Sequence, residues 1–292
     1  GEERDQMGET GVASRQAVGH LSDEQRRFYQ EQGYLVFENV LAPEELAALQ
    51  AASLRLEDQR RALGGDSRLA VIHNVALHDP AFMAAARHPF MLGVVSELLG
   101  PNLRLQHCKL NWKPPAMGAG EVHWHQDFPF FPHTTYDLLA VMFLLDDATP
   151  QNGCMRVIPG SHKLGPVDHY DAGGTFVGHC TDPRAYEAAL REGRVVDFAV
   201  PAGSMTIHHC TTLHASYPNR SSNPRRGLVY QIAAGHAIQL GGNLHKVWNI
   251  WLQGQDPLQA RLEGGPTFRL PRPLTNMGGL EPSADWKRVT QD

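Results

Sequence analysis

Residues 125–133 read HQDFPFFPH and place a histidine and an aspartate, His125 and Asp127, one residue apart. Side chains of an extended segment alternate between its two faces, so this spacing predicts that both point to the same side. His214 and Arg225 follow much later in the chain. Two histidines and one carboxylate suit an iron(II) site that keeps open positions, provided that the strand with the second histidine lies beside the first.

Length, composition and charge set broad limits. The chain has 292 residues, of which 42% are hydrophobic, enough for a sizeable core. Its formal net charge of −5 gives no general attraction to nucleic acid or to an anionic membrane. No apolar run is long enough to span a bilayer, and the first residues lack a signal-peptide pattern. Four widely spread cysteines fit reduced thiols, so we expect a cytoplasmic protein.

The front of the chain has the pattern of helices around one short strand. Ser22 and Gln25 match a capping box, and glycine or proline marks the later helix boundaries. The expected helices run from residue 22 to 33, from 42 onward, and from 89 to 100, with a strand at 34–37.

From about residue 102 the sequence changes to short apolar or alternating runs separated by Gly, Pro and Asn. Many such strands predict an antiparallel barrel or jelly roll with helices packed outside, a mainly β fold. The expected strands are 103–112, 138–145, 155–158, 195–200, 204–208 and 228–232.

No linker divides the chain, so we expect one domain over residues 19–292 after a flexible segment at 1–18. The expected parts of this domain are a helical front (about 20–100), a β-barrel core (about 102–235) and a C-terminal lid or extension (236–292).

Several motifs, in order along the chain, resemble the phytanoyl-CoA dioxygenase family. They are HQDFPFFPH (125–133), LLDDATPQNGCM (144–155), IPGSHK (158–163), LHAS (213–216), PN (218–219) and PR (224–225). The resemblance covers roughly residues 20 to 235. It implies a double-stranded β-helix and an oxygenase that uses iron(II), 2-oxoglutarate and dioxygen.

The resemblance also implies roles for single residues. His125, Asp127 and His214 would be the iron ligands, and Arg225, helped by Ser216, would pair with the distal carboxylate of 2-oxoglutarate. A guanidinium suits this task because it binds a carboxylate through two hydrogen bonds and stays charged. Neighbours on a strand point to opposite sides, so of Arg225 and Arg226 only one should face inward, and the family pattern favours Arg225. Lys109 is a further candidate for a 2-oxoglutarate contact.

For the reaction, the resemblance favours hydroxylation of an unactivated C–H bond in a small organic molecule, such as a natural-product intermediate or an amino-acid derivative, with release of succinate and CO2. Epoxidation, desaturation, ring formation and stereoinversion stay open. Halogenating relatives replace the carboxylate ligand with a small residue, so Asp127 favours oxygenation. The candidate substrate-facing residues are His73, Phe131, His133 and Trp248.

Two interpretations of another class stay open. A non-catalytic β-barrel binding protein would keep the scaffold without needing the whole ligand set. A cupin-type metalloprotein would use His123 with His125, although no glutamate ligand is evident nearby.

Several residues near the motifs have structural explanations. His208 shares the alternation of His214 and is expected near the same face as a packing or supporting residue. Asp146 and Asp147 are expected to face solvent or to form a turn, and residues 152–153 (Asn-Gly) are a hairpin-turn signal. The sequence gives no indication of the oligomeric state.

Overall fold

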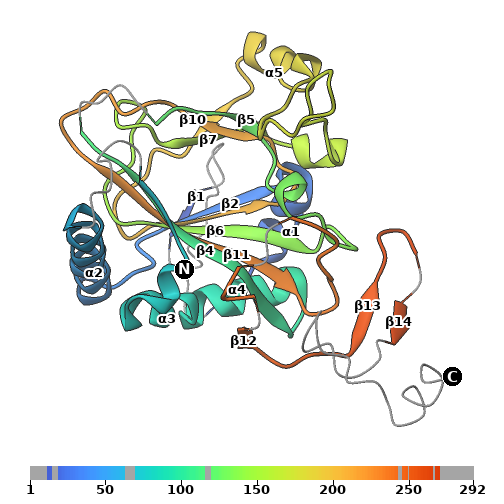
Figure 1. Cartoon of the computed structure of the whole chain (residues 1–292), viewed down its shortest axis with the longest axis horizontal. Coiled ribbons are helices and arrows are strands. Elements are labelled where there is room, and N and C mark those ends of the chain that lie inside the picture. Colours follow the sequence, from blue (N-terminus) through green and yellow to red (C-terminus); the bar gives the residue numbers. More distant parts are fainter. Residues whose placement is uncertain are drawn as a thin grey trace, which may run out of the picture.

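The computed structural model describes residues 12–14, 19–62, 70–115, 120–242, 245–248, 250–265 and 267–269. Two mostly antiparallel sheets lie one above the other (Figure 1). The larger sheet has the strand order β1-β2-β9-β6-β11-β4-β12, with β3 paired to β4, and the smaller has the order β5-β10-β7-β8. This arrangement confirms the mainly β, jelly-roll expectation.

The larger sheet consists of β1 (Val12–Ser14), β2 (Tyr34–Glu38), β3 (Ala70–His73), β4 (Leu103–Lys113), β6 (Leu138–Leu144), β9 (Met205–His209), β11 (Arg225–Ala234) and β12 (Trp251–Gln253). The smaller sheet consists of β5 (Val122–His125), β7 (Met155–Val157), β8 (Val196–Asp197) and β10 (His214–Ser216). A separate pair consists of β13 (Gln259–Arg261) and β14 (Thr267–Arg269).

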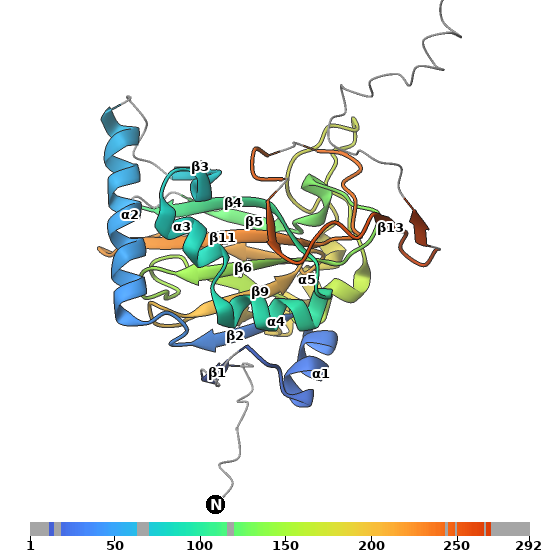
Figure 2. The same ribbon diagram turned by 90° about the horizontal axis from the view of Figure 1, so that it is seen from below.

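Helices pack around the two sheets, mainly on the outer face of the larger one (Figure 1 and Figure 2). They are α1 (Asp23–Gln32), α2 (Pro43–Ala62), α3 (Pro80–Ala86), α4 (Pro89–Leu99) and α5 (Glu187–Arg191), with short 3-10 turns η1 (Val75–Leu77), η2 (Phe128–Phe130), η3 (Ser161–Leu164) and η4 (Pro183–Ala185). Figure 2 shows α3 and α4 lying across this face, and α2 standing at one end of the strands. None of the helices described here is long and apolar enough to cross a membrane.

Two apolar cores follow from the alternation of side chains along the strands. On β2, Leu35 and Phe37 belong to the core under the helices, whereas Tyr34 and Val36 belong to the core between the sheets. The larger sheet therefore buries both of its faces. Part of its inner face lines the site described below.

The predicted helix boundaries agree closely with the structure. Ser22 and Gln25 form the capping box of α1, and Gly33 ends that helix with a φ of +77°. A Cβ atom on Gly33 would lie 2.4 Å from Nδ1 of His162, so a glycine is needed there for space as well as for conformation. The predicted third helix is α4, with the expected end at Leu99.

The helical description of the front was wrong in one respect. The strand expected at 34–37 is β2, but a second strand of this part, β3, was missed, and it joins the larger sheet beside β4. β3 has four residues, too few for a period-two pattern to show. The strand expected at 195–200 is also shorter, since β8 covers Val196–Asp197.

The structure describes only some residues of the two end segments, 1–18 and 236–292. Most of the 1–18 segment lies outside the described residues, so its flexibility stays a prediction. In the C-terminal part, β12 pairs with β4 at the edge of the larger sheet. A lid function for residues 236–292 also stays a prediction.

Candidate metal centre and cosubstrate pocket

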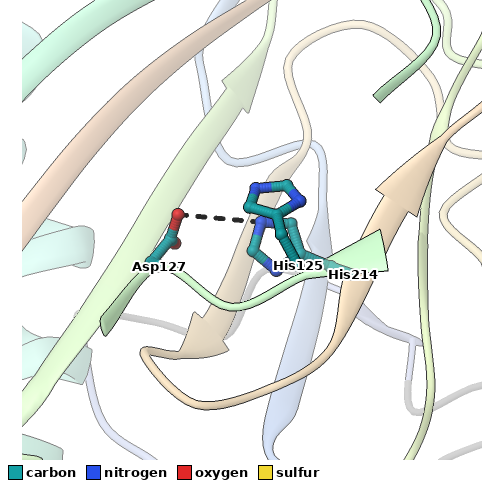
Figure 3. Close-up of side chains that lie close together, drawn as sticks. All are labelled: His125, Asp127 and His214. Carbon is teal, nitrogen blue, oxygen red and sulfur yellow. Dashed lines mark ion pairs between the residues drawn. The ribbon is translucent and has the colours of Figure 1, made fainter. Parts of the chain in front are cut away.

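Two neighbouring strands of the smaller sheet bring the expected iron ligands together. His214 on β10 lies directly opposite His125 on β5, and Asp127 follows β5 by two residues. One ligand atom from each of the three residues lies within 4.8 Å of the others. Oδ1 of Asp127 is 3.7 Å from Nε2 of His214 (Figure 3). The second histidine thus comes from the strand beside that of His125, which is the condition that the predicted iron site depends on.

The extended geometry expected for the H-x-D segment was wrong at Asp127. β5 ends at His125, and Asp127 has helical backbone angles of φ −74° and ψ −37°. The buried Gln126 anchors this change of direction, because its Nε2 donates to the carbonyl oxygens of Thr211 (2.6 Å) and Gly165 (2.8 Å). The turn, rather than strand alternation, aims the carboxylate at the histidines.

Hydrogen bonds fix the orientation of both imidazoles. Nδ1 of His125 donates to the carbonyl oxygen of His123 (2.9 Å), and Nδ1 of His214 donates to that of Thr212 (3.0 Å). Each ring therefore offers its Nε2 lone pair, the arrangement that metal-binding histidines adopt when the other nitrogen is held by a carbonyl.

The carboxylate of Asp127 is held through one of its oxygen atoms. Oδ2 accepts hydrogen bonds from Nε2 of His208 (3.0 Å) and Nε2 of Gln231 (2.6 Å). Oδ1 is left facing the histidines. His208 thus has the supporting position expected for it, whereas Gln231 was not singled out by the sequence.

The protonation states also fit a divalent metal. Burial lowers the pKa of His125 to about 4 and that of His214 well below its usual value. Burial opposes ionisation of Asp127, yet His214 and His208 hold its pKa well below the usual range. At neutral pH the site therefore presents two neutral imidazoles and one carboxylate, the donor set of the non-haem iron(II) facial triad.

A cavity of about 220 Å³ extends from these ligands along the inner face of the larger sheet. Its walls combine the three ligands with polar and apolar residues of β3, β4, β6, β7, β9, β10 and β11. Its lining is Val71, Lys109, Asn111, Lys113, Val122, His125, Asp127, Met142, Met155, His208, His214, Ala215, Ser216, Arg225, Val229 and Gln231. His123 is not among them, so the H-x-H interpretation finds no support here.

Two buried basic side chains, Lys113 and Arg225, lie next to each other in this cavity. Lys113 on β4 is paired in register with Arg225 on β11. Nζ of Lys113 donates to Oγ of Ser216 (2.6 Å) and to the carbonyl oxygen of Tyr217. Nε and Nη2 of Arg225 donate to the carbonyl oxygen of Gly153 (3.1 and 2.8 Å). Within the described ranges, neither side chain forms an ion pair with a carboxylate, so the pair is suited to an anionic ligand.

Lys113 was missed by the sequence analysis, which selected Lys109 on the same strand. Burial, followed by the charge of Arg225, lowers the pKa of Lys113 to about 6. Both lysines line the cavity, because residues 109 and 113 share the alternation of β4. The signal that could have identified Lys113 is its register with Arg225, which depends on knowing that β4 and β11 are neighbours.

The choice between the two adjacent arginines agrees with the structure. Arg225 lines the cavity, whereas Arg226 points away and binds Asp146 through Nη2 (2.6 Å) and Nε (2.8 Å). The expectation that Asp146 faces solvent or forms a turn was therefore wrong. The sequence around Asp146 signals only a turn next to a strand. It does not indicate that the partner of Asp146 is Arg226, which lies far along the chain.

None of the four candidate substrate-facing residues is part of the cavity wall formed by the described residues. Phe131 and His133 are buried, and Phe131 packs on His107 with ring centroids 5.1 Å apart. Trp248 covers the Arg104 guanidinium at 4.7 Å. His73 contacts another ring, as described below. Their contact with substrate stays a prediction.

Comparisons with known proteins agree with this geometry. The family model "Phytanoyl-CoA dioxygenase (PhyH)" matches residues 29–227. A "Probable alpha-ketoglutarate-dependent hypophosphite dioxygenase" of Stutzerimonas stutzeri is 30% identical over 273 residues, which cover 87% of this chain and 94% of that protein. An ectoine dioxygenase of Sphingopyxis alaskensis is 28% identical, with 84% and 87% covered.

Solved structures extend the similarity to the fold. The enzyme EctD from S. alaskensis with 2-oxoglutarate and 5-hydroxyectoine superposes with a TM-score of 0.61 at 25% identity, over 85% of this chain and 89% of that one. The carbocyclase SnoK from nogalamycin biosynthesis, described as non-haem and α-ketoglutarate-dependent, gives 0.63 at 24% identity, over 76% and 88%. The expected fold, enzyme class and cofactors (iron, 2-oxoglutarate and dioxygen) are confirmed. The chain belongs to the phytanoyl-CoA dioxygenase family and is a 2-oxoglutarate-dependent non-haem iron oxygenase that acts on a small molecule.

Proposed function

We propose that this oxygenase hydroxylates an unactivated C–H bond of a small organic molecule, with His125, Asp127 and His214 as its iron ligands. The proposal rests on the ligand atoms of these residues that hydrogen bonds leave unoccupied. Two Nε2 atoms and one Oδ1 atom converge within 4.8 Å, while their other polar atoms are held by hydrogen bonds. Three protein ligands leave about half of an octahedral ion's positions for a 2-oxo acid and dioxygen.

The distal carboxylate of 2-oxoglutarate is assigned to Arg225, Ser216 and Lys113. Arg225 uses two of its five N–H groups on Gly153, which leaves three for a ligand. A carboxylate beside Lys113 favours the charged form of its amine, so we expect proton uptake when the cosubstrate binds near neutral pH. The expected role of Lys109 is taken up below.

When bound, iron supplies the oxidising chemistry, in which 2-oxoglutarate yields succinate and CO2 as an oxygen atom enters the substrate. The chain contributes orientation and a dry environment. Met142, Met155 and Val229 give the cavity an apolar side, which limits access of water to the reacting bond.

The substrates to test first are small polar molecules. The relatives named above act, by name, on ectoine and on hypophosphite. The similarity to the latter protein adds a second candidate reaction, oxygenation of a phosphorus oxyanion. Both would use the same three ligands and the same cosubstrate.

The cellular setting is also a proposal. Cys108, Cys154, Cys180 and Cys210 are buried and unpaired, which supports a reducing, cytoplasmic location. The net charge of −5 supports a protein without nucleic-acid or membrane partners. We further propose that residues 19–292 form one domain.

Replacing the carboxylate ligand tests the iron assignment. We expect Asp127→Ala to abolish iron-dependent succinate formation and to weaken iron(II) binding, because a ligand and a negative charge are lost. Succinate release and iron affinity measure the two effects. Glu44→Ala, which removes an exposed carboxylate in α2, is the matched control. Full succinate formation by Asp127→Ala would rule out the assigned ligand set.

A further inference from the structure

Lys109 is a cation in the metal-containing cavity whose function is not explained by the cosubstrate. It lies on β4 opposite His73 of β3 and Val229 of β11, and it is half-buried in the cavity wall. In the part of the chain that the structure describes, Lys109 forms no hydrogen bond and no ion pair. A partly desolvated ammonium without a partner is costly, and a bound anion would relieve that cost.

The position of Lys109 separates it from the cradle of the distal carboxylate. Lys113, which contacts Ser216, lies four residues further along β4, a distance of ~13 Å along an extended strand. Lys109 instead lies on the iron side, where its charge interacts with that of Asp127. One small carboxylate held by Arg225 and Lys113 therefore does not also reach Lys109.

Three histidines lie close together beside Lys109, outside the lining of the cavity, and one of them, His73, is paired with Lys109 across β3 and β4. The rings of His107 and His245 stack at 4.6 Å, and His73 lies 5.4 Å from His245 and 6.3 Å from His107. Burial, followed by the charge of Lys109, lowers the pKa of each of these histidines. Neutral imidazoles can each donate one hydrogen bond, and that of His107 goes to Oε1 of Gln106. Within the described ranges, no carboxylate forms an ion pair with Lys109 or these three histidines.

The balance of charge in the loaded cavity also leaves Lys109 uncompensated. The two positive charges of iron(II) and the two negative charges of 2-oxoglutarate cancel, as do the charges of Arg225 and Asp127. Lys109 then remains as a positive charge, and protonation of Lys113 would add to it. A cavity of about 220 Å³ is smaller than typical pockets for drug-sized ligands, which favours a compact partner.

We propose that Lys109 binds an anionic group of the primary substrate, a carboxylate or a phosphorus oxyanion, and holds it beside the iron ligands. The neighbouring histidines His73 and His245 supply hydrogen-bond donors to the same group. This inference rests on the proposed function, because the substrate is expected to enter after 2-oxoglutarate is bound. It replaces the expectation that Lys109 contacts 2-oxoglutarate.

The test measures binding of small oxyanions to the loaded enzyme without turnover. Under anaerobic conditions, the protein is saturated with iron(II) and 2-oxoglutarate and titrated calorimetrically with acetate or phosphite, and with acetamide as a neutral probe. Prior saturation keeps these probes away from Arg225. The variants are Lys109→Met and Lys109→Arg, with Lys163→Met as the control that removes an exposed lysine.

We expect at least one oxyanion to bind the wild type and to lose affinity about tenfold or more in Lys109→Met, as for a lost hydrogen bond to a charged group. Lys109→Arg should restore binding, and Lys163→Met should behave as the wild type. Acetamide binding and 2-oxoglutarate affinity should not change. Because the Lys109 side chain forms no hydrogen bond or ion pair in the described part of the chain, its replacement should change thermal unfolding little.

Three results would overturn the inference. Neither oxyanion binds the loaded wild type, or the oxyanion binds equally well to Lys109→Met. Alternatively, Lys109→Met weakens 2-oxoglutarate itself about tenfold, which would assign Lys109 to the cosubstrate. Failure of the wild type to bind 2-oxoglutarate in the presence of iron would instead contradict the proposed function, and it is seen before any oxyanion is added.

Discussion

Asp127 divides its two oxygen atoms between the candidate metal site and the protein. Oδ1 faces His125 and His214, whereas Oδ2 accepts hydrogen bonds from His208 and Gln231. Supporting hydrogen bonds of this kind orient a ligand before the metal arrives, which lowers the entropy cost of binding. The affinity for iron should therefore depend on residues that never touch it.

Gln231→Leu tests this dependence with little change in volume. We expect iron(II) affinity to fall by about 10- to 100-fold, because Asp127 loses its shorter hydrogen bond. Within the described residues Oε1 of Gln231 has no partner, so the substitution removes one hydrogen bond and leaves no new orphan. Competition with a chelator measures the affinity. Gln30→Leu, at an exposed position, is the control, and equal iron affinity in both variants would argue against a supporting role.

How far single residues can be predicted from sequence depends on whether their partners are local. The H-x-D spacing and the later histidine identified all three converging residues. Gln231 and His208 support the site through hydrogen bonds to the Asp127 carboxylate, which is far away in the chain. The alternation of β9 placed His208 on the face of His214, but no pattern within β11 points to the carboxylate, so the contact of Gln231 could not be foreseen.

Among the elements, the turn before β7 holds the side chain of Arg225. Gly153 has a φ of +83°, and its carbonyl oxygen accepts both hydrogen bonds of Arg225. A Cβ atom there would lie 2.4 Å from the carbonyl oxygen of Tyr217. The Asn-Gly signal correctly marked a turn, but a purely structural interpretation was too narrow.

Gly153→Ala should therefore affect both stability and cosubstrate binding. We expect a loss of about 2 kcal/mol in the free energy of unfolding, from strained backbone and a close contact, and weaker 2-oxoglutarate binding because Arg225 is displaced. Gly193→Ala is matched in conformation, with a φ of +66°, but its Cβ would meet nothing within 4 Å. Gly193→Ala should lower the free energy of unfolding without changing the affinity for 2-oxoglutarate. Unaltered 2-oxoglutarate affinity in Gly153→Ala would mean that the turn does not position Arg225.

Elements with local signals were predictable, and elements defined by pairing were less so. The capping box of α1 and the glycine after α4 mark helix ends through contacts within one turn. β3 has four residues and becomes a strand because β4 lies beside it. Tertiary pairing, which no short window contains, decides such segments.

Across the whole molecule, the fold keeps several histidines neutral in its interior. Burial lowers the pKa of His125, His133 and His209 to about 4 each. In the unfolded chain a histidine has a pKa of about 6.5, so the unfolded state binds more protons between these values. The stabilising effect of a neutral histidine is complete above about pH 6.5 and is lost as the pH falls toward about 4.

Unfolding of the metal-free protein by denaturant at several pH values measures this loss. We expect the free energy of unfolding to fall steeply below pH ~6.5, and the slope to decrease by about 1.4 kcal/mol per pH unit in His133→Phe. His78→Phe, at an exposed position, should leave the slope unchanged. A pH-independent free energy of unfolding over this interval would contradict the neutral state of the buried histidines.

The most direct measurement of the site is an anaerobic titration of metal-free protein with iron(II) and then 2-oxoglutarate, followed by visible absorption. We predict a weak charge-transfer band that requires both components. In Arg225→Met, the midpoint of the 2-oxoglutarate titration should move to concentrations about tenfold higher or more. Iron binding itself should survive that substitution, because Arg225 touches none of the three ligands. Tight iron binding without a band, or an unshifted titration in Arg225→Met, would contradict the assigned cosubstrate site.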